Sequence, residues 1–325
     1  MVMKNKKFAF LFPGQGAQYQ GMALDFLETR SAAVKALFDL ASTTLGQDLQ
    51  ALLRDTDAET LMRTDVSQPA ITLANLAAAA YLGEQGIKPT ACAGFSLGEY
   101  AALALAGVVS TGDCFRLVKA RGEFMQEAAD RLRTGASADT APGMAAVVGL
   151  PSEQVEALIA EWAAAGLAGL YAANINSPRQ VVVSGTAAAL GEAEKRFREA
   201  GARRVIRLKV AGPFHSPLMD GAAEKFRPVL EATAFHDPAL PLFSNVTGKR
   251  VSSGEEAKKL ALEQITNPVR WTAEEQALND LKGFDAVLET GPGKVLQGLW
   301  KDSGSMLPCY LAGTVEDIRN LEGRQ

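Results

Sequence analysis

The order of helices and strands expected between residues 144 and 210 constrains the fold more than any other feature of this sequence. Apolar periodicity and turn residues predict the strands Met144–Gly149, Leu170–Asn174, Gln180–Ser184 and Arg203–Val210, and the helices Ser152–Ala165 and Ala187–Ala200. This βαββαβ order over about 70 residues is the split-βαβ arrangement of ferredoxin-like domains. We therefore expect residues 139–210 to form a small domain of that kind.

The rest of the chain alternates short apolar strands with longer amphipathic segments. The expected strands are Phe8–Phe12, Ile87–Gly94, Pro241–Val246 and Ala286–Glu289. The expected helical segments are Gly21–Leu53, Ser67–Leu82, Leu97–Leu105 and a helix from Ser110 or Thr111 to about Ala129. Small and polar residues at 131–143 predict a loop. The 325 residues therefore predict two domains: an α/β-hydrolase-like larger domain of residues 1–138 and 211–325, interrupted by the ferredoxin-like one.

Charge and cysteine content exclude several classes of protein. The 33 basic and 37 acidic side chains give a net charge of −4, which argues against nucleic-acid binding. The three cysteines are widely spaced, so we expect neither a disulfide scaffold nor a metal site. The apolar run Phe8–Phe12 ends at Pro13-Gly14, short of the 7–15 residues of a signal peptide, and no run approaches the ~20 residues of a membrane span. We expect a cytoplasmic protein that binds neither membranes nor nucleic acid.

The strongest local signal for chemistry is Gly94-Phe95-Ser96-Leu97-Gly98, a G-x-S-x-G pattern between an expected strand and an expected helix. In that setting a serine lies on a sharp turn, exposed as a nucleophile. The helix that follows directs N–H groups toward the serine and toward a developing oxyanion. The alternative is an ordinary tight turn. The glycine-rich stretch 14–18 after the first strand resembles, in its position, the loop that supplies a second oxyanion N–H in α/β hydrolases.

A serine nucleophile needs a base, and the sequence contains only His215 and His236. His215 precedes Ser216-Pro217, a good N-cap and N1 pair, so it is expected at a helix start that lowers its pKa. His236 lies in an unremarkable loop. No carboxylate stands out between Ser96 and His215, which favours a dyad over a triad.

Arg121 borders the apolar face of the helix expected at 113–129, where an unpaired cation costs free energy. Two interpretations are equally weighted on the residues alone. One is an internal salt bridge with Glu99 or Glu123, and the other is a fork that grips a substrate carboxylate or phosphate.

Together these stretches resemble the malonyl-CoA:acyl carrier protein transacylases of type II fatty-acid synthesis and the acyltransferase domains of polyketide synthases. The matching segments occur in the family's order and cover nearly the whole chain. They are FPGQGAQ (12–18), GFSLGEYAAL (94–103), RLVKARGEFMQ (116–126), NINSPRQVVVSG (174–185), GPFHSPLM (212–219), LFSNVTG (242–248), QITNPVRW (264–271) and ETGPGKVL (289–296).

The resemblance implies a ping-pong transfer in which Ser96 takes malonyl from malonyl-CoA and passes it to the pantetheine thiol of acyl carrier protein. It implies that His215 is base and acid, that the main chain at Gln264 orients it, and that Arg121 holds the malonyl carboxylate. The N–H groups of Gln15 and Leu97 would form the oxyanion hole. Asn174 and Asn176 would line the cleft, as would Phe214, which matches the malonyl-selective pattern. No cofactor is implied beyond the coenzyme A thioester.

One departure and two alternatives accompany this interpretation. The family usually has histidine before the nucleophile, where this chain has Phe95. A serine hydrolase such as a thioesterase would use the same nucleophile without needing a carboxylate fork, and a catalytically inactive docking module would lack a reactive Ser96 or His215. The basic residues Arg203, Arg204, Arg207 and Lys209 are either a carrier-protein patch or a solvated strand face.

Overall fold

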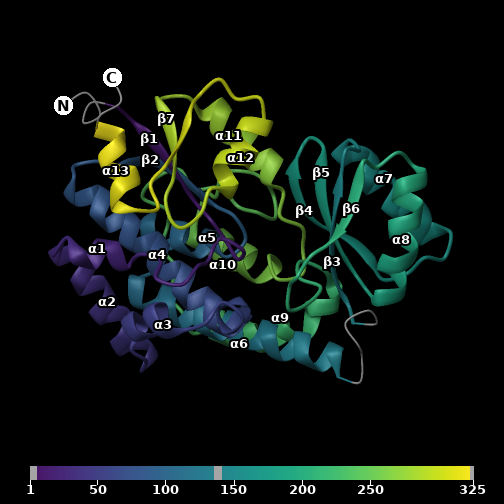
Figure 1. Cartoon of the computed structure of the whole chain (residues 1–325), viewed down its shortest axis with the longest axis horizontal. Coiled ribbons are helices and arrows are strands. Elements are labelled where there is room, and N and C mark those ends of the chain that lie inside the picture. Colours follow the sequence, from purple (N-terminus) through teal and green to yellow (C-terminus); the bar gives the residue numbers. More distant parts are fainter. Residues whose placement is uncertain (1–5, 135–140, 323–325) are drawn as a thin grey trace.

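Two sheets, each of four strands, form the frame of the part of the chain that the structure describes (Figure 1). The computed structural model describes residues 6–134 and 141–322, so part of the loop predicted at 131–143 lies outside the described residues. One sheet is parallel and belongs to the larger part of the molecule, and the other is antiparallel and belongs to the smaller part. The predicted α/β architecture with a larger and a smaller domain is confirmed.

The elements follow one another through the chain as predicted in kind, with shifts of a few residues at their ends. The strands are β1 (Phe8–Phe12), β2 (Pro89–Gly94), β3 (Gly143–Val148), β4 (Leu170–Ser177), β5 (Gln180–Gly185), β6 (Arg204–Arg207), β7 (Ala286–Glu289) and β8 (Cys309–Leu311). The helices before the small sheet are α1 (Leu24–Glu28), α2 (Ala32–Leu45), α3 (Leu49–Asp55), η2 (Thr60–Met62), α4 (Thr64–Glu84), α5 (Gly98–Leu105) and α6 (Thr111–Arg133). Those that follow are α7 (Ser152–Ala164), α8 (Ala187–Glu199), η3 (Pro217–Met219), α9 (Asp220–Glu231), α10 (Gly254–Glu263), α11 (Trp271–Leu281), α12 (Val295–Asp302) and α13 (Val315–Glu322).

The larger sheet has the strand order β2-β1-β7-β8, and all its strands are parallel. β1 is buried along its whole length, because helices cover both faces of the sheet. Its alternate residues enter different cores: Phe10 packs with α4 and α5, and Leu11 packs with Trp271 and Trp300 of α11 and α12. Because β1 and β2 are adjacent and parallel, their carboxyl ends meet at one edge of the sheet, where loops can build a site.

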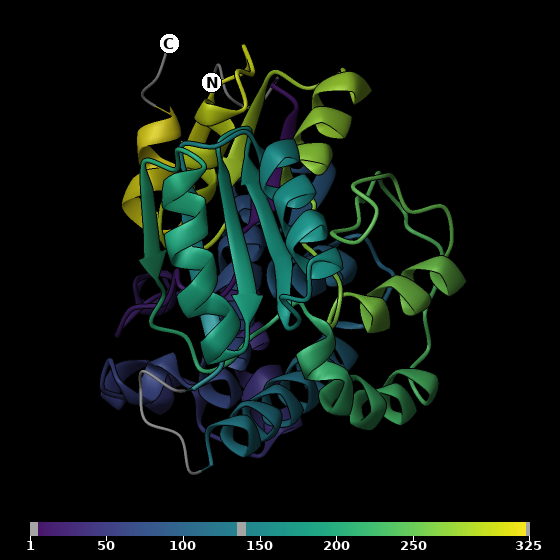
Figure 2. The same ribbon diagram turned by 90° about the vertical axis from the view of Figure 1, so that its right-hand side faces the viewer.

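The smaller sheet has the order β4-β5-β3-β6 and is antiparallel throughout, as in ferredoxin-like domains. Helices α7 and α8 cover its outer face (Figure 2). Along β5, Val181 and Val183 pack into this small core, whereas Val182 between them faces the larger part of the molecule. The open face of the small sheet is thus available as one wall of a cleft.

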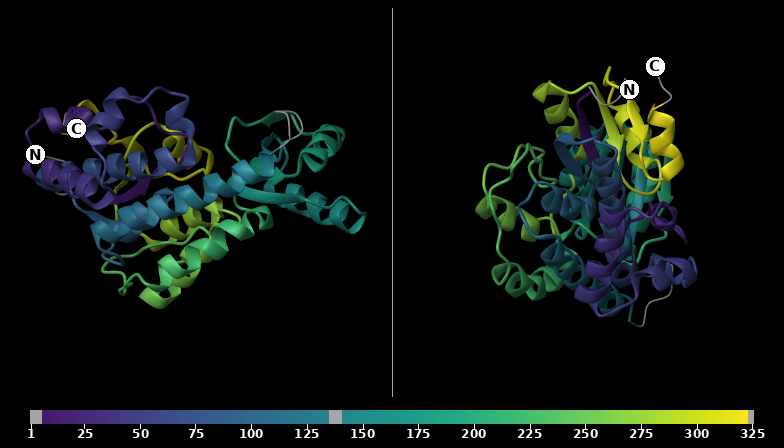
Figure 3. Two further views of the ribbon diagram at one scale, coloured as in Figure 1. Left: turned by 90° about the horizontal axis from the view of Figure 1, so that it is seen from below. Right: turned by 90° about the vertical axis from the view of Figure 1, so that its left-hand side faces the viewer.

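A helix and a backbone pairing are among the contacts that join the two parts. Helix α6 runs from the larger part toward the smaller one (Figure 3). The backbone around Val269 pairs with β4, with Ile175 donating to the Val269 carbonyl at 2.8 Å and Val269 donating to the Ala173 carbonyl at 2.8 Å. The domain boundaries themselves, at 138/139 and 210/211, stay a prediction.

Two expected elements differ from the structure. The long amphipathic segment expected at 21–53 is divided into three helices, because Ser31 and Asp48 cap new helices and Gly46 ends α2 in the left-handed region at φ 64°. The strand predicted at 241–246 is wrong, since only Leu242 pairs with β2, through an isolated bridge to Cys92. The chain then turns away from the sheet, and this brings Asn245 beneath the serine turn.

Candidate active site

Ser96 lies on the sharp turn between β2, which ends at Gly94, and α5, which begins at Gly98. Its φ of 51° is in the left-handed region that non-glycine residues rarely adopt, a strain typical of functional sites. A Cβ on Gly94 would lie 2.0 Å from the backbone of Gly98, and one on Gly98 would lie 2.0 Å from the carbonyl oxygen of Phe12. Both glycines are therefore needed for the turn to pack against the end of β1.

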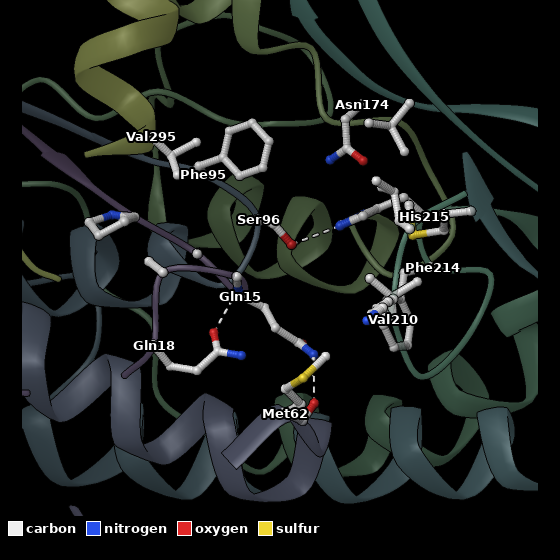
Figure 4. A pocket seen from close by; sticks show the side chains of 18 of the residues that line it. Gln15, Gln18, Met62, Phe95, Ser96, Asn174, Val210, Phe214, His215 and Val295 are labelled. Carbon is white, nitrogen blue, oxygen red and sulfur yellow. Dashed lines mark hydrogen bonds between the residues drawn. The ribbon is translucent and has the colours of Figure 1, made fainter. Parts of the chain in front are cut away.

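His215 lies beside the serine: its Nε2 is 2.7 Å from Ser96 Oγ (Figure 4). On the other side of the ring, Nδ1 is 2.8 Å from the main-chain oxygen of Gln264, which can only accept a hydrogen bond. This carbonyl fixes the proton on Nδ1 and leaves Nε2 free to accept the seryl proton. Burial, and second the nearby Arg121 guanidinium, lower the pKa of His215 to about 4. The imidazole is thus neutral and able to act as a base.

The backbone around His215 differs in part from expectation. The histidine does precede a helical segment, η3 followed by α9, but the Ser216 hydroxyl donates to the Pro213 carbonyl at 2.6 Å instead of capping the helix. Ser184 of β5 donates to the carbonyl of Phe214. These bonds hold His215 at φ 57°, a second left-handed residue in the site. His236 is exposed and lies apart from the serine.

The two backbone N–H groups that the family resemblance assigns to an oxyanion hole have no acceptor among residues 6–134 and 141–322. They belong to Leu97, which follows the serine, and to Gln15, in the loop after β1. Gly16, beside Gln15, donates to Gln18 Oε1, and Ser96 and Gly98, on either side of Leu97, donate to Asn245 Oδ1 and to the Phe95 carbonyl. Free donors beside a nucleophile are the arrangement that stabilises an oxyanion.

Arg121 of α6 lies in the same cavity with only 1% of its surface exposed. None of the ion pairs in the described part of the chain includes it, so the salt bridge with Glu99 or Glu123 is absent there. One Nη donates to Gln264 Oε1 at 2.9 Å, the guanidinium lies 5.4 Å from the centre of the Tyr100 ring, and Nε has no partner. A buried cation with spare donors is suited to binding an anion.

The cavity around these groups has a volume of about 580 Å³. Residues of the larger part form one side, and the open face of the small sheet forms the other with Met144, Asn174, Asn176 and Val182. Asn176 donates to Gln180 Oε1 at 2.9 Å, while its own Oδ1 is buried without a partner. Phe214 also lines the cavity. Every residue predicted for the site lines it except Leu97 and Gln264, whose predicted contributions are the main-chain N–H of Leu97 and the main-chain oxygen of Gln264.

Sequence reasoning missed the polar network under the serine. Asn245 accepts the Ser96 N–H at 2.7 Å and donates to the Gly94 carbonyl at 2.7 Å, so it ties both ends of the turn. Gln264 Nε2 donates to the Ser96 carbonyl at 3.0 Å and to the Glu99 carboxylate. Burial raises the pKa of Glu99 to about 7. The polar run Ser244-Asn245 in the expected strand 241–246 was the available signal for this network.

A metal-binding cluster and a membrane-spanning helix are both absent from the described residues. No group of three or more His, Cys, Asp or Glu side chains there could hold a metal ion. No helix there combines the length and apolar character that crossing a membrane requires.

The fold and the serine–histidine pair place the chain in the class of α/β proteins built for acyl transfer through a serine. Comparison with known proteins agrees. The model of the acyl transferase domain family matches residues 9–322. The malonyl CoA-acyl carrier protein transacylase of Bacillus subtilis is 41% identical over 314 residues, which cover 96% of this chain and 95% of that protein.

Solved structures give the same result. The malonyl-transacylase of Streptococcus pneumoniae superimposes with a TM-score of 0.89 at 34% identity, covering 98% of this chain and 100% of that one. A malonyl-transacylase in complex with a type II polyketide synthase acyl-carrier protein superimposes with a TM-score of 0.87 at 36% identity, covering 98% and 100%. The chain belongs to the acyl transferase family of the malonyl CoA-acyl carrier protein transacylases, and the resemblance noted in the sequence is confirmed.

Proposed function

We propose that this protein transfers the malonyl group of malonyl-CoA to the pantetheine thiol of acyl carrier protein, in fatty-acid or polyketide synthesis, through a malonyl-seryl intermediate on Ser96. The relatives and the acyl-carrier-protein complex among the similar structures support this assignment. The observation that carries it is the buried Arg121, which forms no ion pair within the described residues, in the cavity that holds Ser96 and His215.

The first half-reaction forms the acyl-enzyme. Ser96 Oγ attacks the thioester carbonyl while His215 Nε2 takes the seryl proton, and the N–H groups of Gln15 and Leu97 stabilise the oxyanion. The C–S bond then breaks, and the coenzyme A sulfur leaves as a thiol with the proton from His215. In the second half-reaction the carrier thiol attacks the seryl ester, His215 takes its proton and returns it to Ser96 Oγ. No oxidation state changes, so the reaction needs no further cofactor.

Arg121 would select the acyl group. Its guanidinium can form two parallel hydrogen bonds with the free carboxylate of a malonyl group, whereas an acetyl group offers no partner. A thioesterase has no need for such a fork in its site, and this observation favours malonyl transfer over simple hydrolysis. Asn174, Asn176 and Phe214 would line the acyl site.

Mass spectrometry of the intact protein tests this function. The protein is incubated separately with malonyl-CoA, methylmalonyl-CoA and acetyl-CoA, and we expect one malonyl adduct with the first and little or none with the others. Ser96→Ala should form no adduct. Adding holo acyl carrier protein should discharge the adduct onto the carrier thiol, and release of free malonate in its place would instead identify a hydrolase.

The proposed location is the cytoplasm. Cys92, Cys114 and Cys309 all carry free thiols in the structure, which supports a reducing compartment.

A further inference from the structure

The charges that line the catalytic cavity are unevenly distributed. Its lining contains the cations Arg121 and Lys209 beside the neutral His215, and no carboxylate of the described residues contributes to it. Arg121 is buried, whereas Lys209 is exposed. The cavity therefore has one permanent cation at its inner end and another where it meets solvent.

Lys209 has no bonded partner of its own. It forms none of the ion pairs or side-chain hydrogen bonds found among residues 6–134 and 141–322. It follows β6 on the segment that leads to His215, and its neighbours Leu208 and Val210 line the cavity with it. The other basic residues of this region, Arg203, Arg204 and Arg207, are exposed but do not line the cavity. Lys209 is thus the basic residue of this patch that a bound substrate would meet.

The substrates of the proposed reaction are anionic at the corresponding place. Both the donor and the acceptor carry their thiol on a phosphopantetheine arm, which ends in a phosphate. We propose that Lys209 binds this phosphate and so places the arm for both half-reactions, an inference that rests on the proposed function. One side chain then serves two substrates, because the phosphate is the charged group that they share.

The lengths agree with this assignment. The arm between phosphate and sulfur is about as long as five extended residues, roughly 16 Å. Lys209 lies six residues before His215, and six extended residues span at most about 20 Å. This upper limit is close to the length of the arm, so a phosphate on Lys209 is compatible with a sulfur beside the serine and its base. The exposed apolar side chains of Tyr19, Met62 and Val295, which also line the cavity, offer a surface for the apolar part of the arm.

Acylation kinetics with donors that differ only in the phosphate test the proposal. The donors are malonyl-CoA, malonyl-phosphopantetheine and malonyl-pantetheine, and the variants are Lys209→Met and Lys209→Glu. We expect Lys209→Met to lower kcat/KM about two- to fivefold for the two phosphate-bearing donors, the range of an exposed ion pair, and Lys209→Glu to lower it further. Transfer to holo acyl carrier protein should fall by a similar factor.

Malonyl-pantetheine has no phosphate, so its kcat/KM should be the same in wild type and both variants. Lys249→Met, which removes an exposed lysine outside the cavity, should change none of these values. An equal loss with malonyl-pantetheine would overturn the proposal, and so would a loss confined to malonyl-CoA, since the contact would then be with the nucleotide. Failure of the wild type to be acylated by any of the three donors would refute the proposed function instead.

Discussion

Replacing Arg121 by leucine should change the acyl preference from malonyl toward acetyl. In the proposed complex the guanidinium is paired with the malonyl carboxylate in a site that is 1% exposed, and breaking a buried ion pair typically costs ~3–5 kcal/mol. At 1.4 kcal/mol per factor of ten, malonyl transfer should fall about 10²- to 10³-fold. Acetyl transfer makes no use of the guanidinium and should be retained or improved.

The thermal stability of the same variant separates this role from a structural one. The free protein leaves Arg121 Nε without a partner and forms no ion pair with the guanidinium in the described chain. Burial lowers the pKa of Arg121 more than Tyr100 and the nearby Glu99 raise it, so removal of the cation relieves a cost of burial. We therefore expect Arg121→Leu to melt at the same temperature as the wild type or above it. A structural arginine would give a lower melting temperature and the loss of both activities together.

The assay compares initial acylation rates with malonyl-CoA and acetyl-CoA, measured as the adduct on Ser96. Arg116→Leu is the matched control, because Arg116 lies on the same helix and is exposed in an ion pair with Asp113. It should leave both rates unchanged. An unchanged ratio of the two rates in a stable Arg121→Leu variant would refute the reasoning. Because Arg121 helps to lower the pKa of His215, the variant should also titrate at a higher pH than the wild type.

Three further changes should have measurable effects. His215→Ala should slow acylation about 10²- to 10⁴-fold. In the wild type, burial and the neighbouring guanidinium keep the imidazole neutral, so the acylation rate should stay level from pH 8 to about 5 and fall only near pH 4. An inflection of the rate near pH 6.5 would contradict this. Asn245→Ala leaves the Ser96 N–H without its acceptor and should lower the free energy of unfolding by about 1–3 kcal/mol in denaturant titrations, together with the acylation rate. Gly98→Ala places a Cβ 2.0 Å from the Phe12 carbonyl oxygen, so circular dichroism should report a marked loss of stability, and wild-type melting would show that the turn is looser than described.

Local patterns predicted the parts of this molecule that depend on neighbours in sequence. The turn around Ser96 follows from two glycines between a strand and a helix, and the small sheet follows from alternation and turn residues over one continuous segment. The preference for His215 over His236 as the candidate base also rested on local context, and His215 lies beside Ser96 in the structure. The three helices of residues 24–55 were predictable in principle, since Ser31, Gly46 and Asp48 are ordinary cap residues.

The remaining features depend on residues far apart in the chain. Gln264 orients His215 through a main-chain oxygen, which no residue type marks in a sequence, and only the family resemblance indicated it. Whether Arg121 is paired depends on which carboxylates approach it from other elements. The sequence alone therefore gave equal weight to an internal salt bridge and to a fork for a substrate anion. Asn245 serves a serine 149 positions away, and its role appears only once the predicted strand is seen to leave the sheet after Leu242.

The alternation along the small sheet has a consequence for how substrate preference can evolve or be engineered. Val182 faces the cavity, while Val181 and Val183 on either side of it hold the sheet to α7 and α8. Met144 of β3 likewise faces the cavity. Each of these strands thus has one face whose side chains pack in the small core and stabilise the fold, and another face whose side chains determine the shape of the cavity. Mutations confined to the cavity side can reshape the cavity one side chain at a time, while Ser96 and His215, which lie outside this sheet, keep their geometry.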